Sequence, residues 1–453
     1  MTGLTLEQIA ALCGGAYAGP ESGKALQPNE LVIDSRLITA GNLFAALPGE
    51  KVDGHAFVEK ALAAGAAGVL VTHVPEGVAG PCVVVPDVAK AMADIAEAYR
   101  NTLRIPVIGI TGSVGKTTMK EMVAAVLGAR YRVLKTEKNF NNDLGVPMTV
   151  SRIQPEHQVA VVEMGISHFG EMEQLGKIVR PTDMVYTVIG HSHLEALHDR
   201  NGVLKAKTEH LHYMPATGTL YLNGDDDLLA HYQSLLGIVT FGTTEESMVH
   251  AENVRLNGMN GTICDIVCGD RRIPVEIHAY GKQMVTAALG AAAVAMNFGM
   301  SDKDIIAGIG AYQPVGGRAN VTDTGYLTVI NDCYNANPDS MGAALDSLAM
   351  LEGKKAAILG DMYELGPDSV EMHRAMGEKA AHSGLERVIT CGMLGRDIGA
   401  AAKENGAAVT SFDTREELIA ALPQLVEPGM KVLVKASHGL HLEQVVEALE
   451  HLK

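Results

Sequence analysis

Apolar runs alternate with amphipathic stretches along most of the chain. Short strand-like runs lie at residues 31–34, 67–71 and 82–86, and longer runs typical of buried strands lie at 105–110, 159–163, 184–189 and 219–222. Helical periodicity fills the intervals between them. Because strand and helix alternate, the pattern predicts an α/β fold whose sheets are mostly parallel and covered on both faces. Residues 251–278 alternate in polarity instead, which predicts antiparallel strands.

The same pattern divides the chain into consecutive units. A length of 453 residues is too great for a single core. The predicted units are residues 1–86, a small N-terminal α/β domain, residues 87–313, a longer central α/β series, and residues 314–453, a C-terminal α/β domain with strands at 327–330, 356–359, 387–390 and 431–434. The glycine- and proline-containing segment 314–318 (PVGGR) forms the second joint.

Composition narrows the functional classes. Apolar residues make up 47% of the chain, charged residues 20% and aromatic residues 4%, and the formal net charge is −17. An acidic chain with few aromatic rings is a poor partner for nucleic acids and anionic membranes. The N-terminal segment carries Glu7 where a signal peptide is apolar. We therefore expect a cytoplasmic protein with no nucleic-acid partner and no membrane insertion. A monomer is expected as well, although neither composition nor charge determines the oligomeric state.

Residues 111–118 (TGSVGKTT) follow the strand at 105–110 directly, and a helical stretch begins at Met119. Glycines let backbone N–H groups point into a turn, and the helix N-terminus adds the positive end of its dipole. This order predicts a phosphate-binding loop, in which Lys116 contacts the outer phosphates and the Thr117 hydroxyl binds Mg²⁺. The strict GxxxxGKT pattern places glycine at position 110, where this chain has Ile110, so only TGxxGKT is met.

A carboxylate that can complete a magnesium site ends the apolar run at 159–163. Ligands collect at the carboxyl ends of parallel strands, so Glu163 is the best candidate, although its spacing fits a plain surface carboxylate equally well. His191 and His193 follow the next strand, where a single histidine is more often structural. From the residues alone, the chain is predicted to be a P-loop ATPase or kinase, and no finer conclusion follows.

Further segments, taken in order, resemble the Mur ligase family. They are residues 139–147 (NFNNDLGVP), 190–195 (GHSHLE), 206–209 (AKTE), 317–318 (GR), 332–341 (DCYNANPDSM) and 359–366 (LGDMYELG). The YNANP and GDMxELG runs are similar to the branch that adds D-alanyl-D-alanine. Residues 34–36 (DSR), 41–44 (GNLF) and 53–57 (DGHAF) resemble the uridine-nucleotide domain of that family. The resemblance spans nearly the whole chain.

The resemblance implies a fold and a reaction. The fold is a three-domain architecture with a small N-terminal domain for the UDP-linked substrate, a central ATP-binding P-loop domain and a C-terminal Rossmann-like ligase domain. The reaction is an ATP-dependent, ADP-forming amide ligation in peptidoglycan precursor synthesis. It joins D-alanyl-D-alanine to UDP-N-acetylmuramoyl-tripeptide through an acyl phosphate, with Mg²⁺ as cofactor.

The resemblance also implies roles for individual residues. Lys116, Lys207 and His193 are the expected catalytic residues, and Thr117, Glu163, His193 and Lys207 (as a carbamate) are the expected metal ligands. The expected ATP-binding residues are Gly112, Ser113, Val114, Gly115, Lys116, Thr117, Thr118, Arg318 and Asp332. The expected substrate-binding residues are Ser35, Arg36, Asn141, Asn142, Tyr334 and Asn335. Without the resemblance, Lys207 would be interpreted as a solvated helix lysine.

The chain departs from the family pattern at a few positions. The usual HNxxN run near the adenine is replaced by Gln283, Met284 and Ala287, and the usual KGSR reads KASH at 435–438. Two alternatives therefore remain beside the D-alanyl-D-alanine-adding ligase. One is a sister ligase, either the tripeptide-forming Mur ligase or an enzyme like folylpolyglutamate synthase. The other is a degenerate paralogue that binds nucleotide or partner proteins without catalysis.

Overall fold

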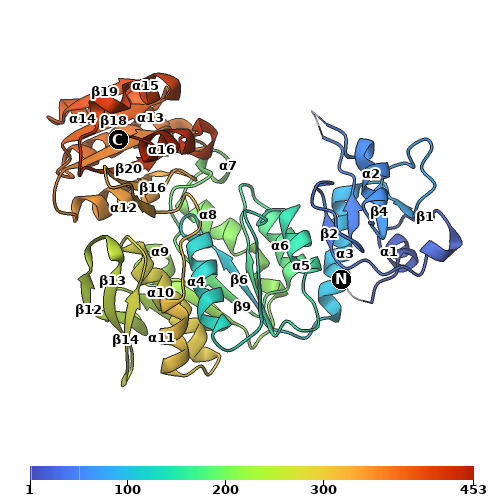
Figure 1. Cartoon of the computed structure of the whole chain (residues 1–453). Helices are drawn as coiled ribbons and strands as arrows, with labels where there is room; N and C mark the ends of the chain where they lie inside the picture. The colour runs from blue at the N-terminus through green and yellow to red at the C-terminus, as the bar shows by residue number, and fades with distance from the viewer. Residues whose placement is uncertain (2, 50–51, 453) are drawn as a thin grey trace.

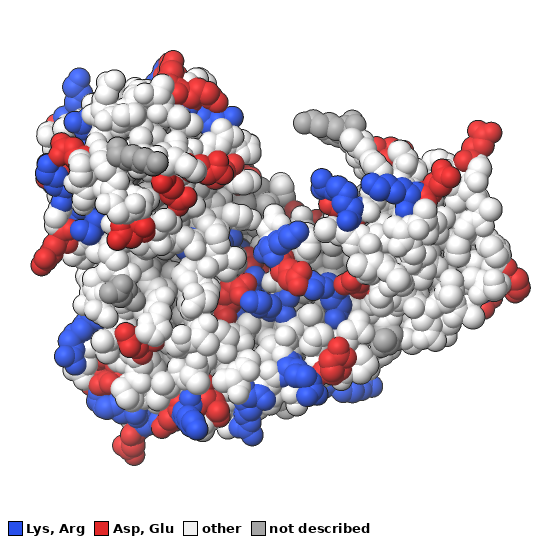
Figure 2. Space-filling model, viewed as in Figure 1, with Lys and Arg blue, Asp and Glu red and all other residues white. Residues whose placement is uncertain are grey.

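The structure is a computed structural model that describes residues 1, 3–49 and 52–452. In these residues the chain forms three sheets in succession, each with its own helices, so the predicted α/β class is confirmed. Figure 1 shows the N-terminal lobe (blue) set apart from the central lobe (cyan to yellow), with the C-terminal lobe (orange to red) stacked on the central one. On the face shown in Figure 2, acidic and basic side chains are interspersed, and a notch opens between the N-terminal and C-terminal lobes above the central one.

The N-terminal sheet is small and mostly parallel. Its order is β1-β5-β4-β3-β2, and β1 pairs antiparallel with β5. Its elements are α1 (Leu6–Leu12), β1 (Ala16–Ala18), β2 (Leu31–Val32), β3 (Leu43–Ala45), α2 (Val58–Ala63), β4 (Gly68–Val71) and β5 (Cys82–Val84). The strand predicted at 31–34 is shorter than expected, because the chain enters a turn at Ser35 and Arg36.

The central sheet positions the site. Its order is β14-β13-β12-β11-β10-β9-β6-β8-β7. The strands are β6 (Val107–Thr111), β7 (Val133–Lys135), β8 (Val159–Glu163), β9 (Asp183–Tyr186), β10 (Thr219–Asn223), β11 (Gly237–Gly242), β12 (Val249–Leu256), β13 (Thr262–Cys268) and β14 (Arg271–Ile277). The run from β7 to β12 is parallel, and β13 pairs antiparallel with β12 and β14, as the alternating pattern at 251–278 predicts.

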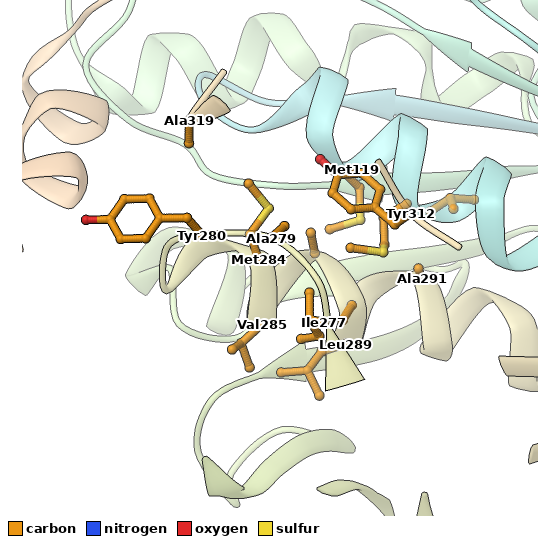
Figure 3. Close-up of a cluster of buried hydrophobic side chains, with 14 of the residues drawn as sticks. Met119, Ile277, Ala279, Tyr280, Met284, Val285, Leu289, Ala291, Tyr312 and Ala319 are labelled. Atoms are coloured by element: carbon orange, nitrogen blue, oxygen red, sulfur yellow. The ribbon is translucent and has the colours of Figure 1, made fainter. Parts of the chain in front are cut away.

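Helices cover the central sheet and surround its carboxyl edge. They are α4 (Lys116–Gly128), α5 (Gly145–Ser151), α6 (Glu171–Val179), α7 (Leu194–Leu197), α8 (Arg200–Lys207), α9 (Asp227–Ala230), α10 (Gln283–Asn297) and α11 (Asp302–Gly310). Figure 3 shows part of an apolar cluster that contains Met119 of α4 together with Met284, Leu289 and Ala291 of α10. The two helices approach closely, since a Cβ on Gly290 would overlap the side chain of Met119. This packing fixes the N-termini of α4 and α10 relative to each other.

The C-terminal sheet has the order β15-β16-β20-β17-β18-β19 and is parallel apart from the β15–β16 pair. Its elements are β15 (Asn320–Asp323), β16 (Thr328–Asn331), α12 (Pro338–Ala349), β17 (Lys355–Gly360), α13 (Ser369–Ala381), β18 (Arg387–Cys391), α14 (Gly395–Glu404), β19 (Val409–Phe412), α15 (Arg415–Leu425), β20 (Lys431–Lys435) and α16 (Glu443–Glu450). Side chains alternate along each strand, so Ala357 and Leu359 pack with α12–α14 while Ala356 and Ile358 pack with α15 and α16. This is a two-sided, doubly covered sheet.

Helix α3 (Val88–Thr102) joins the N-terminal lobe to the central one, because it packs against α1 on one side and α5 and α6 on the other. The domain boundary predicted after residue 86 lies just before α3, and the one predicted after 313 lies between α11 and β15. Both boundaries stay predictions. Among the described residues, no helix combines the length and apolar character needed to span a bilayer.

Candidate active site between the central and C-terminal sheets

The predicted phosphate loop connects β6 to α4. Gly112 has a φ of 147° and Gly115 a φ of 82°, which are conformations that favour glycine. A Cβ on Gly112 would overlap the hydroxyl of Thr187, so no larger residue fits there without a shift. The bare backbone lets the loop turn tightly and direct its N–H groups toward the start of α4. The loop therefore has the local structure of an anion-binding site.

Lys116, the first residue of α4, folds back over this loop. Its Nζ donates hydrogen bonds to the carbonyl oxygens of Gly112 (2.7 Å) and Ser113 (3.4 Å). Burial lowers the pKa of Lys116, Glu163 opposes that shift and Arg318 adds to it. The ammonium therefore feels the charges of a carboxylate of the central sheet and of a guanidinium of the C-terminal lobe.

The carboxylate of Glu163 lies at the end of β8 and is 1% exposed. It accepts hydrogen bonds from the hydroxyl of Thr117 (2.9 and 3.0 Å) and from the amide of Asn141 (2.8 Å). A buried carboxylate beside a hydroxyl provides the hard oxygen ligands that Mg²⁺ prefers. Thr117 and Asn141, which are both expected at the site, thus contact the carboxylate of Glu163, which is expected there as well.

Sequence reasoning missed Lys120, which is also 1% exposed. Its Nζ donates to the carbonyl oxygen of Thr136 (2.7 Å) and lies 2.9 Å from Glu121 and 3.8 Å from Glu163. A buried cation and a buried carboxylate lower each other's cost of burial. The signal in the sequence was the helical spacing, because Lys120 lies one turn after Lys116 on the same helix.

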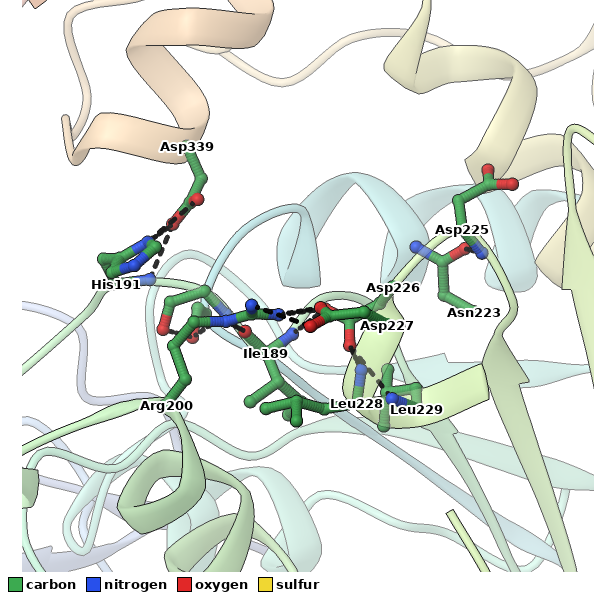
Figure 4. Close-up of polar contacts among 12 residues, drawn as sticks. Ile189, His191, Arg200, Asn223, Asp225, Asp226, Asp227, Leu228, Leu229 and Asp339 are labelled. Atoms are coloured by element: carbon green, nitrogen blue, oxygen red, sulfur yellow. Dashed lines mark hydrogen bonds and ion pairs between the residues drawn. The ribbon is translucent and has the colours of Figure 1, made fainter. Parts of the chain in front are cut away.

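The loop after β9 carries both histidines and is held by a polar network (Figure 4). Asp226 accepts the backbone N–H of Ile189 (2.8 Å), and Arg200 donates to the carbonyl oxygen of Ile189 (2.7 Å). His191 contacts Asp339 at the start of α12, where its backbone N–H donates at 2.6 Å. His193 has a φ of 54° and lines the same cavity as Lys116 and Glu163. The loop is thus fixed from both lobes.

Lys207 is 1% exposed at the end of α8, so it is not a solvated lysine. Burial lowers its pKa well below the ordinary range; Lys116 adds to the shift and Glu171 opposes it. Its carbonyl oxygen accepts from His210 (3.1 Å), which fixes the end of the helix. A lysine whose pKa is lowered has a larger share of the neutral amine at neutral pH.

The C-terminal lobe supplies the other wall of the site. The guanidinium of Arg318 lies 4.1 Å from the ring centroid of Tyr334. Asp332 accepts from Lys435 (2.6 Å) and from the backbone N–H of Ala319 (3.2 Å), and Lys435 also donates to the carbonyl oxygen of Asn335 (3.0 Å). The pairing with buried Lys435 was not foreseen in the sequence.

These groups surround one cavity of about 720 Å³. Residues predicted for the site that line it are Ser113, Val114, Gly115, Lys116, Thr117, Thr118, Asn141, Asn142, Glu163, His193, Arg318, Asp332, Tyr334 and Asn335. Gly112 and Lys207 are not among the residues that line it. The cavity lies between two lobes, where ligand sites commonly form.

Ser35 and Arg36 lie outside this cavity, in a turn of the N-terminal lobe. Arg36 is exposed and pairs with Asp34 at 2.7 Å. Hydrogen bonds from Arg36 are the main cause that lowers the pKa of Asp34 to about 2, and the charge of Lys138 in the central lobe makes a smaller contribution to that shift. Lys138 directly precedes Asn139, which lines the cavity, so the turn and the cavity are linked by the segment after β7.

A glycine loop between a central parallel strand and a helix, facing a second lobe across a cavity, defines a P-loop nucleotide-binding protein of several domains. Models of the Mur ligase catalytic domain, the Mur ligase middle domain and the Mur ligase glutamate ligase domain match residues 29–110, 110–295 and 317–438. The chain belongs to the Mur ligase family.

Relatives that match over the full length of the chain belong to one branch of the Mur ligase family. UDP-N-acetylmuramoyl-tripeptide–D-alanyl-D-alanine ligase of Bacillus subtilis is 36% identical over 98% of each chain. The ligase of the same name from Escherichia coli is 33% identical over 99% of each chain.

Solved structures lead to the same group. MurF from Acinetobacter baumannii superposes with a TM-score of 0.88, at 30% identity and over 99% of each chain. MurF from Thermotoga maritima, in complex with ADP, has a TM-score of 0.81 at 25% identity, over 94% of this chain and 98% of that one. The predicted three-domain Mur ligase architecture is confirmed.

Proposed function

We propose that this chain is an ATP-dependent, ADP-forming ligase that joins D-alanyl-D-alanine to UDP-N-acetylmuramoyl-tripeptide in peptidoglycan precursor synthesis. The observation that carries the proposal is full-length identity of 36% and 33% to two ligases of that name. The P-loop cavity supports it independently, since the residues that would handle the triphosphate lie together there. Because the substrates are ATP and a nucleotide-linked precursor, we place the reaction in the cytoplasm, and one chain supplies the whole cavity, so a monomer suffices.

The reaction would run in two balanced steps. A carboxylate oxygen of the tripeptide attacks the γ-phosphorus of ATP, the bond to the β-phosphate oxygen breaks, and ADP leaves. The amine of D-alanyl-D-alanine then attacks the carbonyl carbon of the acyl phosphate, phosphate leaves with the bonding electrons, and the nitrogen loses a proton. Two anions must approach each other in the first step, so the loop amides and Lys116 would stabilise the charge that develops.

The described residues fit Mg²⁺ better than a metal held entirely by protein. Thr117 and Glu163 are in contact, and no cluster of three or more His, Cys, Asp or Glu side chains converges in the part of the chain that the structure describes. Mg²⁺ commonly takes one or two carboxylates and completes its shell with phosphates and water. When bound, it would neutralise phosphate charge. Thr117, Glu163, His193 and Lys207 are the proposed ligands.

Lys207 would act as a carbamate. A neutral amine attacks CO₂ and loses one proton, which converts the cation into an oxygen anion. The lowered pKa of Lys207 supports this role, because it keeps the amine neutral more often than an exposed lysine. The same change would remove the repulsion between Lys207 and Lys116.

The remaining predicted residues would bind the substrates. Ser35 and Arg36 would meet the uridine diphosphate in the N-terminal lobe. Asn141, Asn142, Tyr334 and Asn335 line the cavity where the tripeptide end and the dipeptide would meet. Arg318 and Asp332 would close on the nucleotide from the C-terminal lobe.

The two alternatives have less support. A folylpolyglutamate synthase from Mycobacterium tuberculosis matches at 15% identity with a TM-score of 0.63, which is a likeness of fold alone. A degenerate paralogue is disfavoured by the contacts that connect Thr117, Glu163 and Asn141, since these polar groups stay paired around an open cavity.

One assay tests the proposal. The purified chain receives ATP, Mg²⁺, UDP-N-acetylmuramoyl-tripeptide (the lysine or the diaminopimelate form) and D-alanyl-D-alanine. We expect one ADP and one phosphate for each amide formed. Phosphate release with a different amine, or ATP binding without turnover, would contradict the proposal.

A variant pair places the chemistry at the loop. Lys116→Met should lower turnover by about 100- to 1,000-fold, the usual effect of removing one group that stabilises developing charge. Lys177→Met is the matched control, because Lys177 is exposed on α6 and pairs with Glu97. Equal turnover of the two variants would show that Lys116 of the loop does not take part in the reaction.

A further inference from the structure

The start of α12 connects the C-terminal lobe to the central one. Asp339 is the second residue of this helix, and its carboxylate accepts the backbone N–H of His191 at 2.6 Å (Figure 4). The ring nitrogen Nδ1 of His191 lies 3.2 Å from the same carboxylate. A carboxylate in the first turn of a helix is favourably placed in the helix dipole. A hydrogen bond between a charged acceptor and a backbone N–H thus joins the two lobes.

Gly190 leaves free the space that Asp339 occupies. A Cβ at position 190 would lie 2.2 Å from Oδ2 of Asp339 and 2.8 Å from its Cγ. Both distances are far inside van der Waals contact, so a larger residue would displace the carboxylate. The backbone of Gly190 lies outside the left-handed region, so its conformation does not itself call for glycine. The missing side chain therefore serves the contact between the lobes.

Gly190 is also bonded to the phosphate loop. Its N–H donates to the hydroxyl of Ser113 (3.0 Å), and that hydroxyl donates to the carbonyl oxygen of Gly190 (3.1 Å). The N–H of Ser113 donates to the carbonyl oxygen of Val188 (2.7 Å). Ser113 lines the cavity, whereas Gly190 and Asp339 are not among the residues that line it. Residues 190 and 191 thus bond to the phosphate loop on one side and to the C-terminal lobe on the other.

The segment that makes both contacts is held within the central lobe. Arg200 donates to the carbonyl oxygen of Ile189, and Asp226 accepts the N–H of Ile189 (Figure 4). Because these bonds do not involve the C-terminal lobe, they orient the N–H of His191 whether or not Asp339 is docked. A donor that is already oriented loses little entropy when its acceptor binds. The loop after β9 is therefore a preorganised docking surface for α12.

We propose that Asp339 is a positioning residue that docks the C-terminal lobe beside the phosphate loop, with Gly190 as the position that admits it. This contact holds Arg318 and Asp332, which belong to the same lobe, across the cavity from Lys116. Asp339 acts through this placement and not by contact with the reacting groups. Its effect on turnover rests on the proposed function, whereas the docking contact itself does not.

The test exchanges a clash between positions 190 and 339. Gly190→Ala puts a methyl group where Oδ2 of Asp339 lies, so the C-terminal lobe should no longer dock. Asp339→Ala removes the carboxylate, and its Cβ would lie 3.5 Å from the new methyl carbon, which is an ordinary contact. The double variant Gly190→Ala/Asp339→Ala should therefore dock better than Gly190→Ala alone. Effects of the two substitutions that simply add would overturn the proposal.

Small-angle X-ray scattering of the full-length chain, with ADP and Mg²⁺ present, measures the docking. We expect a larger radius of gyration for Gly190→Ala than for the wild type, and a return toward the wild-type value in the double variant. ADP formation with the full set of substrates measures turnover. It should fall by about 10- to 150-fold in Asp339→Ala, the range for loss of a hydrogen bond to a charged group. Gly190→Ala should lose more, and the double variant should recover to the level of Asp339→Ala.

Two controls separate the possible failures. Asp346→Ala, an exposed change on the same helix, should alter neither the radius of gyration nor turnover. Circular dichroism should be the same for all variants, because the contact lies between the lobes and not within either of them. A wild-type radius of gyration in Gly190→Ala, or no recovery in the double variant, would overturn the role of Asp339. The expected order of radii without turnover in the wild type would instead overturn the proposed function.

Discussion

Nδ1 of His193 lies 2.5 Å from a carboxylate oxygen of Glu364, although the first residue belongs to the central lobe and the second to the C-terminal lobe. The two atoms are close, but their geometry is not that of an aligned hydrogen bond. Both residues have left-handed backbone conformations, with φ values of 54° and 62°. Such conformations are costly outside glycine and persist where the surroundings enforce them. The C-terminal lobe therefore determines how His193 faces the cavity.

A first prediction concerns this pair. If His193 binds Mg²⁺ through its other ring nitrogen, Glu364 orients it, and removing the charge of such a partner typically weakens metal binding by about 10- to 100-fold. Glu364→Gln should show that loss in Mn²⁺ binding followed by electron paramagnetic resonance with ADP present. Glu371→Gln, an exposed change on α13, is the control. Equal Mn²⁺ affinity in both variants would mean that Glu364 contacts His193 without orienting it for the metal.

A second prediction concerns Lys207. Lys207→Met removes a buried amine whose lowered pKa costs folding free energy at neutral pH, so we expect the thermal midpoint to stay the same or rise. Turnover should fall by about 100-fold or more, since the proposed carbamate can no longer form. Thermal unfolding and ADP release measure the two effects.

Two comparisons make the Lys207 result specific. Lys205→Met, an exposed change on the same helix, should alter neither quantity. Lys207→Ala leaves space beside the metal ligands, and a small carboxylate such as formate should restore part of its activity. A fully active Lys207→Met would rule out the carbamate.

Much of the site followed from local sequence. A glycine loop between a strand and a helix predicts a phosphate site because its three parts are consecutive, and the carboxyl end of a buried strand predicts Glu163. Lys207 could also have been found without the family resemblance. It lies one helical turn after the apolar Val203, and both are buried on the same face of α8.

Contacts between distant segments could not be predicted in this way. Lys435 and Asp332 are more than a hundred residues apart in sequence, and nothing in the local pattern of either pairs them. Nothing in the sequence around Glu364 distinguishes it from other charged loop residues. Its contact with His193 arises only because the C-terminal lobe stacks on the central one. The strand at 31–34 ends early because Asp34 bonds to Arg36 and closes a turn, which outweighs the β-preference of Ile33.

A third prediction concerns the support of the histidine loop. Asp226 is 6% exposed and accepts N–H groups from Ile189, Leu228 and Leu229. Asp226→Ala removes a helix cap and leaves a buried N–H without an acceptor, so we expect a loss of about 2–4 kcal/mol in stability. Asp226→Asn keeps an accepting oxygen and should lose less. Urea unfolding compares them, and equal stability of Asp226→Ala and wild type would contradict the network.

The last prediction is a pH dependence at the start of β9, away from the cavity. Asp183 is 9% exposed, and burial raises its pKa, while hydrogen bonds from Thr182 and Thr219 oppose that shift. Between the ordinary pKa and the raised one, the folded chain holds a proton that the unfolded chain has lost. By linkage, stability falls as pH rises through that interval, and the cost of the buried charge is complete at neutral pH.

Asp183→Asn removes this cost, because the amide is neutral at every pH and its oxygen can still accept from Thr182 (2.7 Å in the wild type). The variant should have a higher urea midpoint than the wild type at pH 7. The difference should shrink as pH falls through the raised pKa toward the ordinary one, below which the wild-type carboxyl is protonated in both states. Asp270→Asn, in the exposed turn between β13 and β14, should show neither effect. A gain in Asp183→Asn that is independent of pH would trace the effect to packing and not to the buried charge.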